Sequence, residues 1–251
     1  MAQRNTQWRR RRILDLLDAS GEVAVEALAQ EFHTSEVTIR KDLGALESHG
    51  LLLRRHGGAI PLPQKPLRAG AAASAVKQKI ARLAAAQIRH HSRIIIDSGN
   101  TTAALLPELG KLQGLVVMTN SLGIAQSLLA LDNQPTLLMP GGTWDARSEA
   151  FQGQLAEQML RAYDFDQLFI GADGLDLERG TTTFNELYGL SRVMAEVAAE
   201  VIVLAESDKL GRKIHNLELP WSVIDLLVTD ANLSDDNKHT IEQQGVRVLC
   251  A

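Results

Sequence analysis

Cysteine is nearly absent, since Cys250 is the only one in the 251-residue chain. A disulfide or a cysteine-based metal site within one chain is therefore excluded, which is typical of a protein kept in a reducing compartment. No run of about 18 apolar residues predicts a membrane span, and the amino-terminal arginines are not followed by the apolar segment of a secretory signal. We expect a cytoplasmic protein with no membrane partner, no metal and no cofactor.

Aromatic residues are also scarce, at 4% against 45% hydrophobic residues overall, so the core should be aliphatic. The formal net charge of −4 argues against a protein that coats nucleic acid with its whole surface. Positive charge is concentrated instead at the amino end, where the first twelve residues carry five arginines and no acidic residue. Such a run is either a solvated helix face or a phosphate-contacting surface, and a neighbouring DNA-binding element favours the second interpretation.

Residues 35–58, SEVTIRKDLGALESHGLLLRRHGG, contain the most informative pattern. Ser35 is a good N-cap, and Ile39, Leu43 and Leu46 follow it at helical spacing as one apolar stripe. The opposite face is cationic and lightly built, and it carries Val37, Arg40, Lys41, Gly44 and Ser48. A face of this kind can enter the major groove of DNA and reach phosphates and base edges.

The flanking segments complete a winged helix-turn-helix. Residues 8–18 and 22–32 predict two amphipathic helices, and a tight turn at 33–34 precedes the basic helix. Residues 51–55 indicate a strand that ends in a glycine turn, which gives the wing. We expect DNA contacts from Ser35, Val37, Thr38, Arg40 and Lys41 on the helix and from Arg54, Arg55 and His56 on the wing. For Val37, packing into the core is the open alternative, because a helical wheel tolerates small register errors.

Residues 61–76 contain three prolines followed by small residues, which indicates a linker. The pattern beyond it alternates between amphipathic helices and apolar runs. Helices are predicted at 77–89, 101–109, 122–131, 154–163, 185–200 and 234–244. Strands are predicted at 93–97, 115–119, 136–139, 167–171, 201–205, 226–229 and 246–249. This alternation predicts an α/β domain over 77–251, with a mostly parallel sheet between helices, after a DNA-binding domain over 1–60.

Glycine, hydroxyl and amide residues collect where these strands end, and ligands bind at that edge of open α/β sheets. The first strand runs into DSGNTT (97–102), where a glycine before a helix offers N–H groups and hydroxyls to a phosphate. Each loop alone is more often only a turn, but their number favours a site for a small, polyhydroxylated, phosphorylated molecule. We assign to it Asp97, Ser98, Gly99, Asn100, Thr101, Thr102, Asn120, Gly141, Gly142, Asp173, Glu186 and Lys209. Residues 98–102 should hold the phosphate, with Lys209 as the balancing cation.

Two sets of segments resemble one known family. The run LAQEFHTSEVTIRKDLGALESHGLLLRRHGGA resembles the amino-terminal signature of the DeoR family of bacterial transcriptional regulators. The segments DSGNTT, MTNSL, LLMPGG, GADGLD, TTTFNE and SDKLGRK are similar to the sensor domain of that family. The resemblance implies a sensor fold like that of ribose-5-phosphate isomerase and the CoA-transferase group. It also implies a carbohydrate-operon repressor that binds operator double-stranded DNA and is released by a sugar phosphate.

Within the family, the sensor segments most resemble repressors of glucitol (sorbitol) operons and, next, of the N-acetylgalactosamine pathway. Glucitol 6-phosphate is therefore one candidate effector. Two departures bear on the sugar: Glu206 stands where many members have Asp or a small residue, and Leu210 replaces a common Phe.

Two other functions stay open at this point. A sugar-phosphate isomerase fused to a DNA-binding module would need a placed acid and base, for which Asp173, Glu186 and Lys209 are the available groups, but no histidine lies in the loops. An architectural DNA-binding protein would need no ligand, and the DSGNTT loop argues against it. Because such DNA-binding heads act in pairs on repeated half-sites, we expect a homo-oligomer, either dimer or tetramer.

Overall fold

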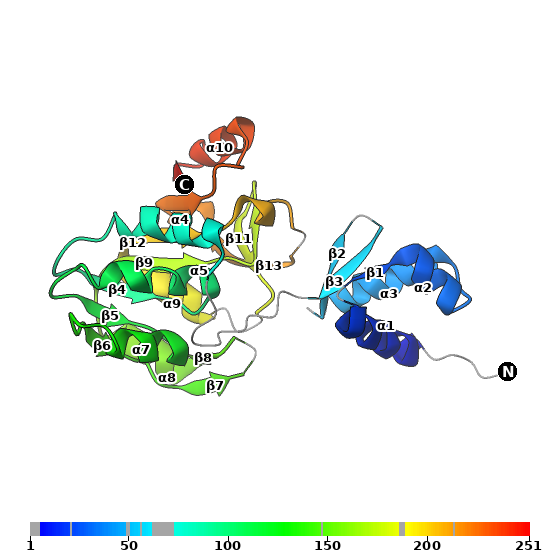
Figure 1. Ribbon diagram of the computed structural model, residues 1–251, viewed down its shortest axis with the longest axis horizontal. Coiled ribbons are helices and arrows are strands. Elements are labelled where there is room, and N and C mark those ends of the chain that lie inside the picture. The colour runs from blue at the N-terminus through cyan, green and yellow to red at the C-terminus, as the bar shows by residue number, and fades with distance from the viewer. Residues whose placement is uncertain are drawn as a thin grey trace. The chain divides into compact units, whose positions relative to one another are not determined.

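A computed structural model describes residues 6–20, 22–48, 51–55, 57–61, 73–146, 148–185, 189–212 and 214–251. The chain divides into two units, residues 1–64 and 65–251 (Figure 1), and each contains its own hydrophobic clusters. Among the described residues, no helix has both the length and the apolar character needed to cross a membrane.

The first unit combines three helices with a small antiparallel sheet. The helices are α1 (Thr6–Ser20), α2 (Val25–Glu31) and α3 (Glu36–Ser48). The strands, in the spatial order β1-β3-β2, are β1 (Val23–Ala24), β3 (Gly58–Pro61) and β2 (Leu52–Arg55). The buried core includes Ile13, Leu17, Leu28, Ile39 and Leu43. The predicted winged helix-turn-helix is confirmed.

A short strand replaces the start of a predicted helix in this unit. Residues 22–32 were expected to be helical, but Val23 and Ala24 pair with β3, and α2 begins only at Val25. This pairing covers the second edge of β3, which would otherwise stay open. Gly58 permits it, because a Cβ at this position would lie 2.2 Å from the Val23 carbonyl oxygen. Gly57, with φ +81°, supplies the left-handed turn that the sequence predicted.

The second unit is built on a seven-stranded sheet in which every neighbouring pair is parallel. In spatial order the strands are β15 (Arg247–Cys250), β14 (Leu226–Thr229), β12 (Ala198–Leu204), β9 (Phe165–Gly171), β4 (Arg93–Ile96), β5 (Val116–Met118) and β6 (Thr136–Leu138). The chain order therefore reverses between β4 and β9, which is where open α/β sheets bind ligands. The predicted α/β class is confirmed.

Helices cover both faces of this sheet (Figure 1). One face carries α4 (Ala75–Ala85), α5 (Asn100–Ala103), α6 (Leu106–Leu109) and α7 (Leu122–Leu129). The other carries α8 (Gln154–Leu160), α9 (Gly189–Glu196) and α10 (Asp235–Glu242). In β4, Ile94 and Ile96 belong to one apolar layer and Ile95 to the other, and all three are fully buried. Burial on both faces explains why the strands appear in the sequence as continuous apolar runs.

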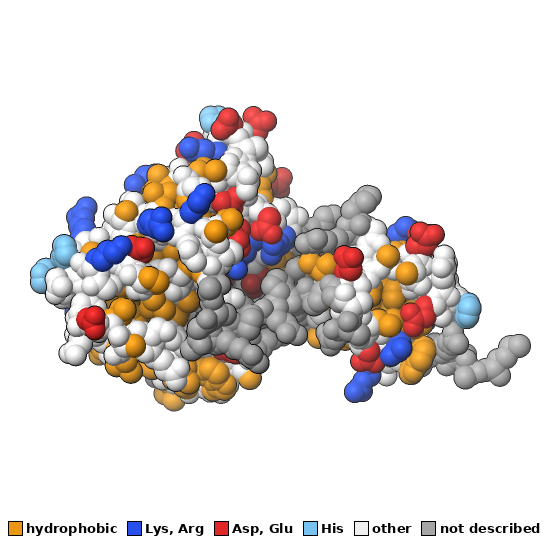
Figure 2. All heavy atoms as spheres, viewed as in Figure 1, with side chains coloured by type: hydrophobic (Ala, Val, Ile, Leu, Met, Phe, Trp, Pro, Cys, Tyr) orange, Lys and Arg blue, Asp and Glu red, His pale blue; other side chains and the backbone are white. Residues whose placement is uncertain are grey.

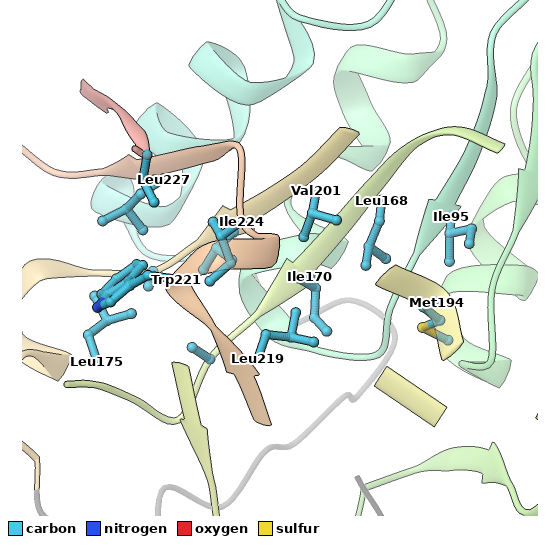
Figure 3. Packing of buried hydrophobic residues seen from close by; sticks show 14 of the residues in the cluster. Ile95, Leu168, Ile170, Leu175, Met194, Val201, Leu219, Trp221, Ile224 and Leu227 are labelled. Carbon is cyan, nitrogen blue, oxygen red and sulfur yellow. The ribbon is translucent and has the colours of Figure 1, made fainter. Parts of the chain in front are cut away.

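Short polar strands form two further pieces that the sequence did not predict. They are the hairpin of β7 (Thr143–Asp145) and β8 (Ala150–Gln152), and the antiparallel sheet of β10 (Gly174–Asp176), β11 (Gly180–Thr183) and β13 (Asn216–Pro220). Trp221 follows β13 and joins the smaller sheet to the main core. Its indole N–H donates to the carbonyls of Asp176 (2.9 Å) and Leu177 (3.1 Å). Figure 3 shows its ring beside Leu175, in the same cluster as Ile170 of β9.

The helices predicted for the second unit all have different bounds in the structure, and three of the differences have a clear physical cause. The helix expected at 101–109 is divided into α5 and α6, because Pro107 has no N–H to continue the ladder and its ring crowds the carbonyl one turn earlier. The helix expected at 185–200 ends at 196, since residues 198–200 pair with β9 and sheet pairing overrides helical propensity. α4 begins at Ala75, where Ser74 caps it. Residues 62–72 of the expected linker lie outside the described residues.

Replacing Gly58 with alanine should destabilise the first unit by about 1–3 kcal/mol, the usual cost of overpacking, because the new Cβ would collide with a backbone carbonyl. Gly44→Ala is the matched control. Its Cβ would lie 3.5 Å from the Arg54 guanidinium, an ordinary contact, and alanine should stabilise the helix by about 0.5–1 kcal/mol. Denaturant unfolding followed by circular dichroism measures both variants. Shifts of the same sign would contradict this account of Gly58.

Candidate functional site

Ser35 starts the helix that carries the candidate DNA-binding face. Its hydroxyl accepts a hydrogen bond from the Thr38 N–H (3.2 Å) and lies 2.9 Å from the Thr38 hydroxyl. This cap satisfies one of the N–H groups that have no partner within the first turn of α3. Both hydroxyls therefore lie at the end of the helix that would enter the groove first.

The outward face of α3 is exposed as its helical wheel predicts. Arg40 and Lys41 are exposed and Val37 is 58% exposed, whereas Ile39 and Leu43 are fully buried. The alternative in which Val37 packs into the core is therefore wrong. Arg40 is paired with a glutamate one turn earlier in the helix. A solvent-exposed pair of this kind contributes little to stability, so the guanidinium can exchange it for a phosphate or a base.

A buried ion cluster, which the sequence analysis missed, joins α1 to α3. Asp42 is 2% exposed and accepts hydrogen bonds from Arg9 and, at 2.9 Å, from Arg10. The sequence does contain a signal for this cluster. Asp42 occupies a core-facing position of the helix beside Leu43, and a buried acid requires a partner. These two arginines therefore fix α1 against α3, and of the four arginines of the run that the structure describes, those at 11 and 12 are the exposed ones.

The wing presents one described cationic side chain, that of Arg54. Its backbone N–H donates to the Glu47 carboxylate (3.1 Å), and its guanidinium lies 3.7 Å from the same group while remaining 44% exposed. Arg55 is described only through its backbone in β2, and His56 lies outside the described residues. The DNA contacts expected of these two residues stay predictions.

In the second unit, Asn120 ties together the loops that follow β4 and β5. It is 3% exposed, its Nδ2 donates to Asp97 Oδ1 (2.9 Å), and its Oδ1 accepts from the Ser98 N–H (3.0 Å). On the other side of β4, the Asp97 N–H donates to the Phe169 carbonyl of β9 (3.0 Å). Residues from three strands are therefore linked directly at the point where the strand order reverses.

The loop after β4 turns at Gly99, whose φ is +153°, and the helix behind it has only four residues. An anion here would depend on the loop's own N–H groups and hydroxyls, rather than on the longer helix that the sequence indicated. Thr102 is fully buried, and its hydroxyl donates to two loop carbonyls at 2.7 and 2.8 Å, so it shapes the loop from behind. Ser98 and Thr101 are buried, at 6% and 4% exposure, and Asn100 is half-buried.

Polar contacts continue around this edge through residues that were not selected from the sequence. β8 donates a backbone N–H to the Asn120 carbonyl (2.8 Å), and Gln152 of β8, 4% exposed, accepts from Asn185 Nδ2 (3.4 Å). The Asn185 N–H donates to the Thr183 hydroxyl, which donates to Asp173 Oδ2, each at 3.0 Å. Asn185 belongs to the polar segment TTTFNE (181–186), which the sequence singled out. Gln152 has no sequence signal beyond the glycine that follows it.

Two cations lie beside the end of β9. Lys209 donates to the Ala172 carbonyl (2.6 Å), and Arg212 donates to the Asp173 carbonyl (3.2 Å) while pairing with Asp208 (2.7 Å). The Arg212 side chain is only 21% exposed, and its hydrogen bonds brace the loop that carries Lys209.

Asp230 anchors the segment that leads into Lys209. It accepts hydrogen bonds from the Ser207 N–H (2.6 Å), the Ser207 hydroxyl (2.9 Å) and the Asn232 N–H (3.1 Å). Burial alone raises the pKa of this carboxyl, but the hydrogen bonds from Ser207 and Asn232 together outweigh it and hold the pKa below its ordinary value. Asp230 is therefore ionised and anchors the loop across the neutral range.

The remaining assigned residues are less closely connected. A Cβ on Gly142 would lie 2.5 Å from the Gln152 carbonyl oxygen, so this glycine lets the loop after β6 approach β8. Gly141, with φ +66°, is exposed with open space around it, and Glu186 lies outside the described residues. Within the described ranges, no group of three or more His, Cys, Asp or Glu side chains could hold a metal ion.

Replacing Asp230 with asparagine should lower the free energy of unfolding at pH 7 by about 1–3 kcal/mol, because hydrogen bonds to a charged acceptor are lost. The pKa of Asp230 is lower in the folded than in the unfolded chain. Its contribution is therefore present above the unfolded value of about 4 and disappears as the pH falls through the folded value. Urea unfolding of both proteins should show a difference at pH 7 that shrinks below about pH 4. A difference that does not change with pH would contradict the anchoring role.

The sequence matches two family descriptions over most of its length. Residues 9–64 match the DeoR-like helix-turn-helix domain, and residues 72–231 match the DeoR C terminal sensor domain. Two relatives are each 35% identical to the chain. The "Putative aga operon transcriptional repressor" of Escherichia coli O157:H7 aligns over 97% of this chain and 93% of its own length. The "HTH-type transcriptional regulator GlpR" of Haloferax volcanii aligns over 96% of both.

Solved structures give a more distant match. Ribose 5-phosphate isomerase A from Methanocaldococcus jannaschii has a TM-score of 0.39 and 20% identity, over 53% of each chain. A likeness of this size carries no argument about activity. The two domain matches fall on the two units described above, and both relatives align with nearly the whole chain. The chain belongs to the DeoR family of transcriptional regulators.

Proposed function

We propose that this regulator represses a carbohydrate-utilisation operon in the cytoplasm and leaves its operator when a phosphorylated sugar or sugar alcohol binds the second unit. The similarity of the sensor segments to glucitol-operon repressors makes glucitol 6-phosphate the first effector to test. Phosphosugars of the N-acetylgalactosamine pathway come next. The names of the full-length relatives support a transcriptional role and leave the effector to experiment.

The observation that carries this proposal is the connected set of polar groups where β4 and β9 diverge. The loop at Ser98 and Gly99 offers N–H groups and hydroxyls to a phosphate, with Lys209 supplying charge at the neighbouring loop. Amide and carboxylate groups at Asn120 and Asp173 can pair with sugar hydroxyls on the other side. Glu186 is proposed to lie with them.

An isomerase is the less favoured function for this site, because it needs a carboxylate free to move a proton between adjacent carbons. One oxygen of Asp173 already accepts from the Thr183 hydroxyl (3.0 Å) and the Phe184 N–H (3.2 Å). Lys209 likewise donates to a backbone carbonyl. These contacts suit a binding site held in a fixed shape. Incubation of the purified protein with sugar phosphates, monitored for isomer formation, tests the alternative directly.

Ligand binding can act on the linker through α4. Lys77 lies in the first turn of α4, 3.7 Å from Glu206, which directly precedes Ser207. The same helix packs against α5, the short helix that follows Gly99. A ligand that prefers one arrangement of these loops would shift α4, whose cap Ser74 stands next to the linker. We expect pairs of DNA-binding heads to respond together, as dimers or tetramers on double-stranded operator DNA.

Operator release tests the proposal as a whole. Operator fragments are first selected from random DNA with the purified protein, and binding is then measured against phosphorylated hexoses, hexosamines and hexitols. Release by one phosphorylated compound and not by its unphosphorylated form is the expected result. If every compound leaves the complex intact, or both forms act equally, the proposed effector class is wrong.

Replacing Arg40 with alanine should weaken operator binding by about 1–3 kcal/mol, because a guanidinium that reads a base edge is lost. The loss should be larger on the selected operator than on scrambled DNA. Fluorescence anisotropy with both DNAs at several salt concentrations measures it. Unchanged affinity for the operator would remove Arg40 from the interface.

Arg12 and Val37 supply the matched controls for that experiment. Arg12→Ala removes an exposed cation outside α3, so affinity should fall alike for both DNAs, and the slope of log K against log salt should decrease by about one. Val37→Ser should keep the stability of the unit, because the side chain is 58% exposed, and should alter base preference where a thymine methyl was contacted. An unchanged base preference would remove Val37 from the DNA interface.

Replacing Gly99 with valine should abolish the response to the effector while leaving DNA binding intact. A side chain is strained at φ +153°, and its Cβ would lie 3.2 Å from the Thr102 hydroxyl, where the phosphate approaches the backbone. The variant should keep the operon silent in the presence of its sugar, as measured by a reporter gene and by operator release in vitro.

Thr101→Val is a second variant that tests the same loop if Gly99→Val does not fold. It removes one buried hydroxyl from the same loop and preserves the branched shape of the side chain, so the effector should bind more weakly to a folded protein. If either variant folds, binds DNA and is released at the wild-type effector concentration, the phosphate has been placed on the wrong loop.

A further inference from the structure

A cavity of about 480 Å³ lies at the amino-terminal edge of the seven-stranded sheet, opposite the edge that carries the proposed effector site. Its walls come from the loop that precedes β4 and from the first residues of β9, β12 and β15. The volume falls in the range of small-molecule sites in proteins, roughly 300–1,000 Å³. Figure 2 shows histidine side chains beside Lys and Arg side chains at the left edge of this unit.

A hydrogen-bonded chain that runs from the buried Gln167 to the exposed Arg247 forms one side of the cavity. Gln167 is 8% exposed, and its Nε2 donates to the Gln87 carbonyl (3.1 Å) and to Glu200 (2.8 Å). The other oxygen of Glu200 accepts from Arg247 (2.7 Å), which fixes that guanidinium at the rim. Gln167 Oε1 is buried and has no hydrogen-bond partner in the described part of the chain. An unpaired buried acceptor is costly, and a donor on a bound molecule would remove that cost.

The hydrogen-bond donors around the cavity are the groups with unused capacity. Across the described ranges, the side chains of Arg89 and His91 form no hydrogen bond or ion pair. His90 accepts the Gln113 N–H at its Nδ1 (3.0 Å), so its Nε2 carries the proton and can donate. The acids are largely engaged, because one oxygen of Asp166 accepts a backbone N–H (2.7 Å) and both oxygens of Glu200 are paired. Free donors therefore exceed free acceptors.

We propose that this cavity binds a small anion, a phosphate or a carboxylate, that also carries a hydroxyl or amino donor. The anionic group would lie between Arg89 and Arg247, with a histidine ring beside it. The donor group would satisfy the amide oxygen of Gln167 once that side chain turns toward the cavity, because the oxygen is now closed off from solvent. The site is separate from the one at the β4–β9 divergence, so the binding claim does not depend on the proposed effector.

The cavity also stands at the far end of a helix already implicated in the response. α4 carries Lys77 near its start, and Gln87, whose carbonyl takes part in the cavity's hydrogen-bonded chain, lies just past its end. A molecule bound here would act on the same helix from the opposite end. This consequence, unlike the binding itself, rests on the proposed function, and it would make operator release respond to a second metabolite.

Histidine ring 1H–13C spectra of the full-length protein test the binding, with inorganic phosphate and gluconate as the two probes. His90→Gln and His91→Gln assign the signals. No histidine was assigned to the effector site, so phosphate bound there would leave these two rings unaffected. Saturable shifts of the His90 and His91 signals with at least one probe are the expected result. A response to phosphate alone identifies a phosphate site, and a response to gluconate alone identifies a hydroxy-acid site.

Arg89→Gln is the decisive variant, because among the described residues this exposed side chain forms no hydrogen bond or ion pair. It should raise the dissociation constant of the probe that responds by about tenfold or more, the loss expected for one charge-assisted hydrogen bond. Lys238→Gln, which removes an exposed cation from α10, is the matched control and should leave the dissociation constant unchanged. The proposal is overturned if neither probe gives a saturable shift, or if Arg89→Gln binds as tightly as the wild type.

Discussion

The second unit depends on the parallel pairing of β4 with β9. From this pair the chain builds outward in both directions, so the right-handed crossovers place their helices on opposite faces of the sheet. The loops that leave the two strands therefore diverge, and polar groups can occupy the space between them without a helix to fill it. The bond from the Asp97 N–H to the Phe169 carbonyl holds the strands together where they separate. Asn120 then links the loop after β4 to the loop after β5, so the placement of Asp97, Ser98 and Asn120 follows from this pair of strands.

The first unit depends on a different constraint, the neutralisation of one buried acid. Asp42 faces the core between apolar residues of α3, and it is tolerated only because two arginines of α1 reach it. Removing one partner of a buried ion pair typically costs about 3–5 kcal/mol, because the remaining charge has no solvent. Two of the five arginines in the amino-terminal run therefore hold the orientation of α3 against α1. The orientation of α3, which carries the proposed DNA-contacting residues Val37 and Arg40, therefore depends on a charge buried on the other side of the helix.

Features with a long repeating pattern could be predicted from the sequence, and those that depend on a distant partner could not. The apolar stripe of α3 and the strand at Ile94–Ile96 follow from periodicity and from burial on both faces. By contrast, Val23 and Ala24 belong to a segment whose apolar spacing predicts a helix. They form a strand only because β3 has an open edge near Gly58 with which they can pair. The loops at the carboxyl edge could be grouped in advance, because parallel strands bring their ends together. The contact between Gln152 and Asn185 depends on a hairpin whose short polar strands carry no pattern of their own.

In the proposed response, the free-energy cost of moving α4 determines whether ligand binding at the sheet edge can affect the linker. Its buried face consists of Ile80 and three alanines, Ala81, Ala84 and Ala85. Small side chains interlock little with the sheet beneath them, so a short sliding movement of this helix costs less than it would for larger residues. The restraint at its first turn, between Lys77 and Glu206, is a partly exposed ion pair, 25% and 23% exposed on its two sides, and is correspondingly weak. A ligand moves such an equilibrium only by its difference in affinity for the two positions. In the proposed response both the packing and the ion pair would oppose the movement weakly, so a ligand would need a preference of only a few kcal/mol to move the helix.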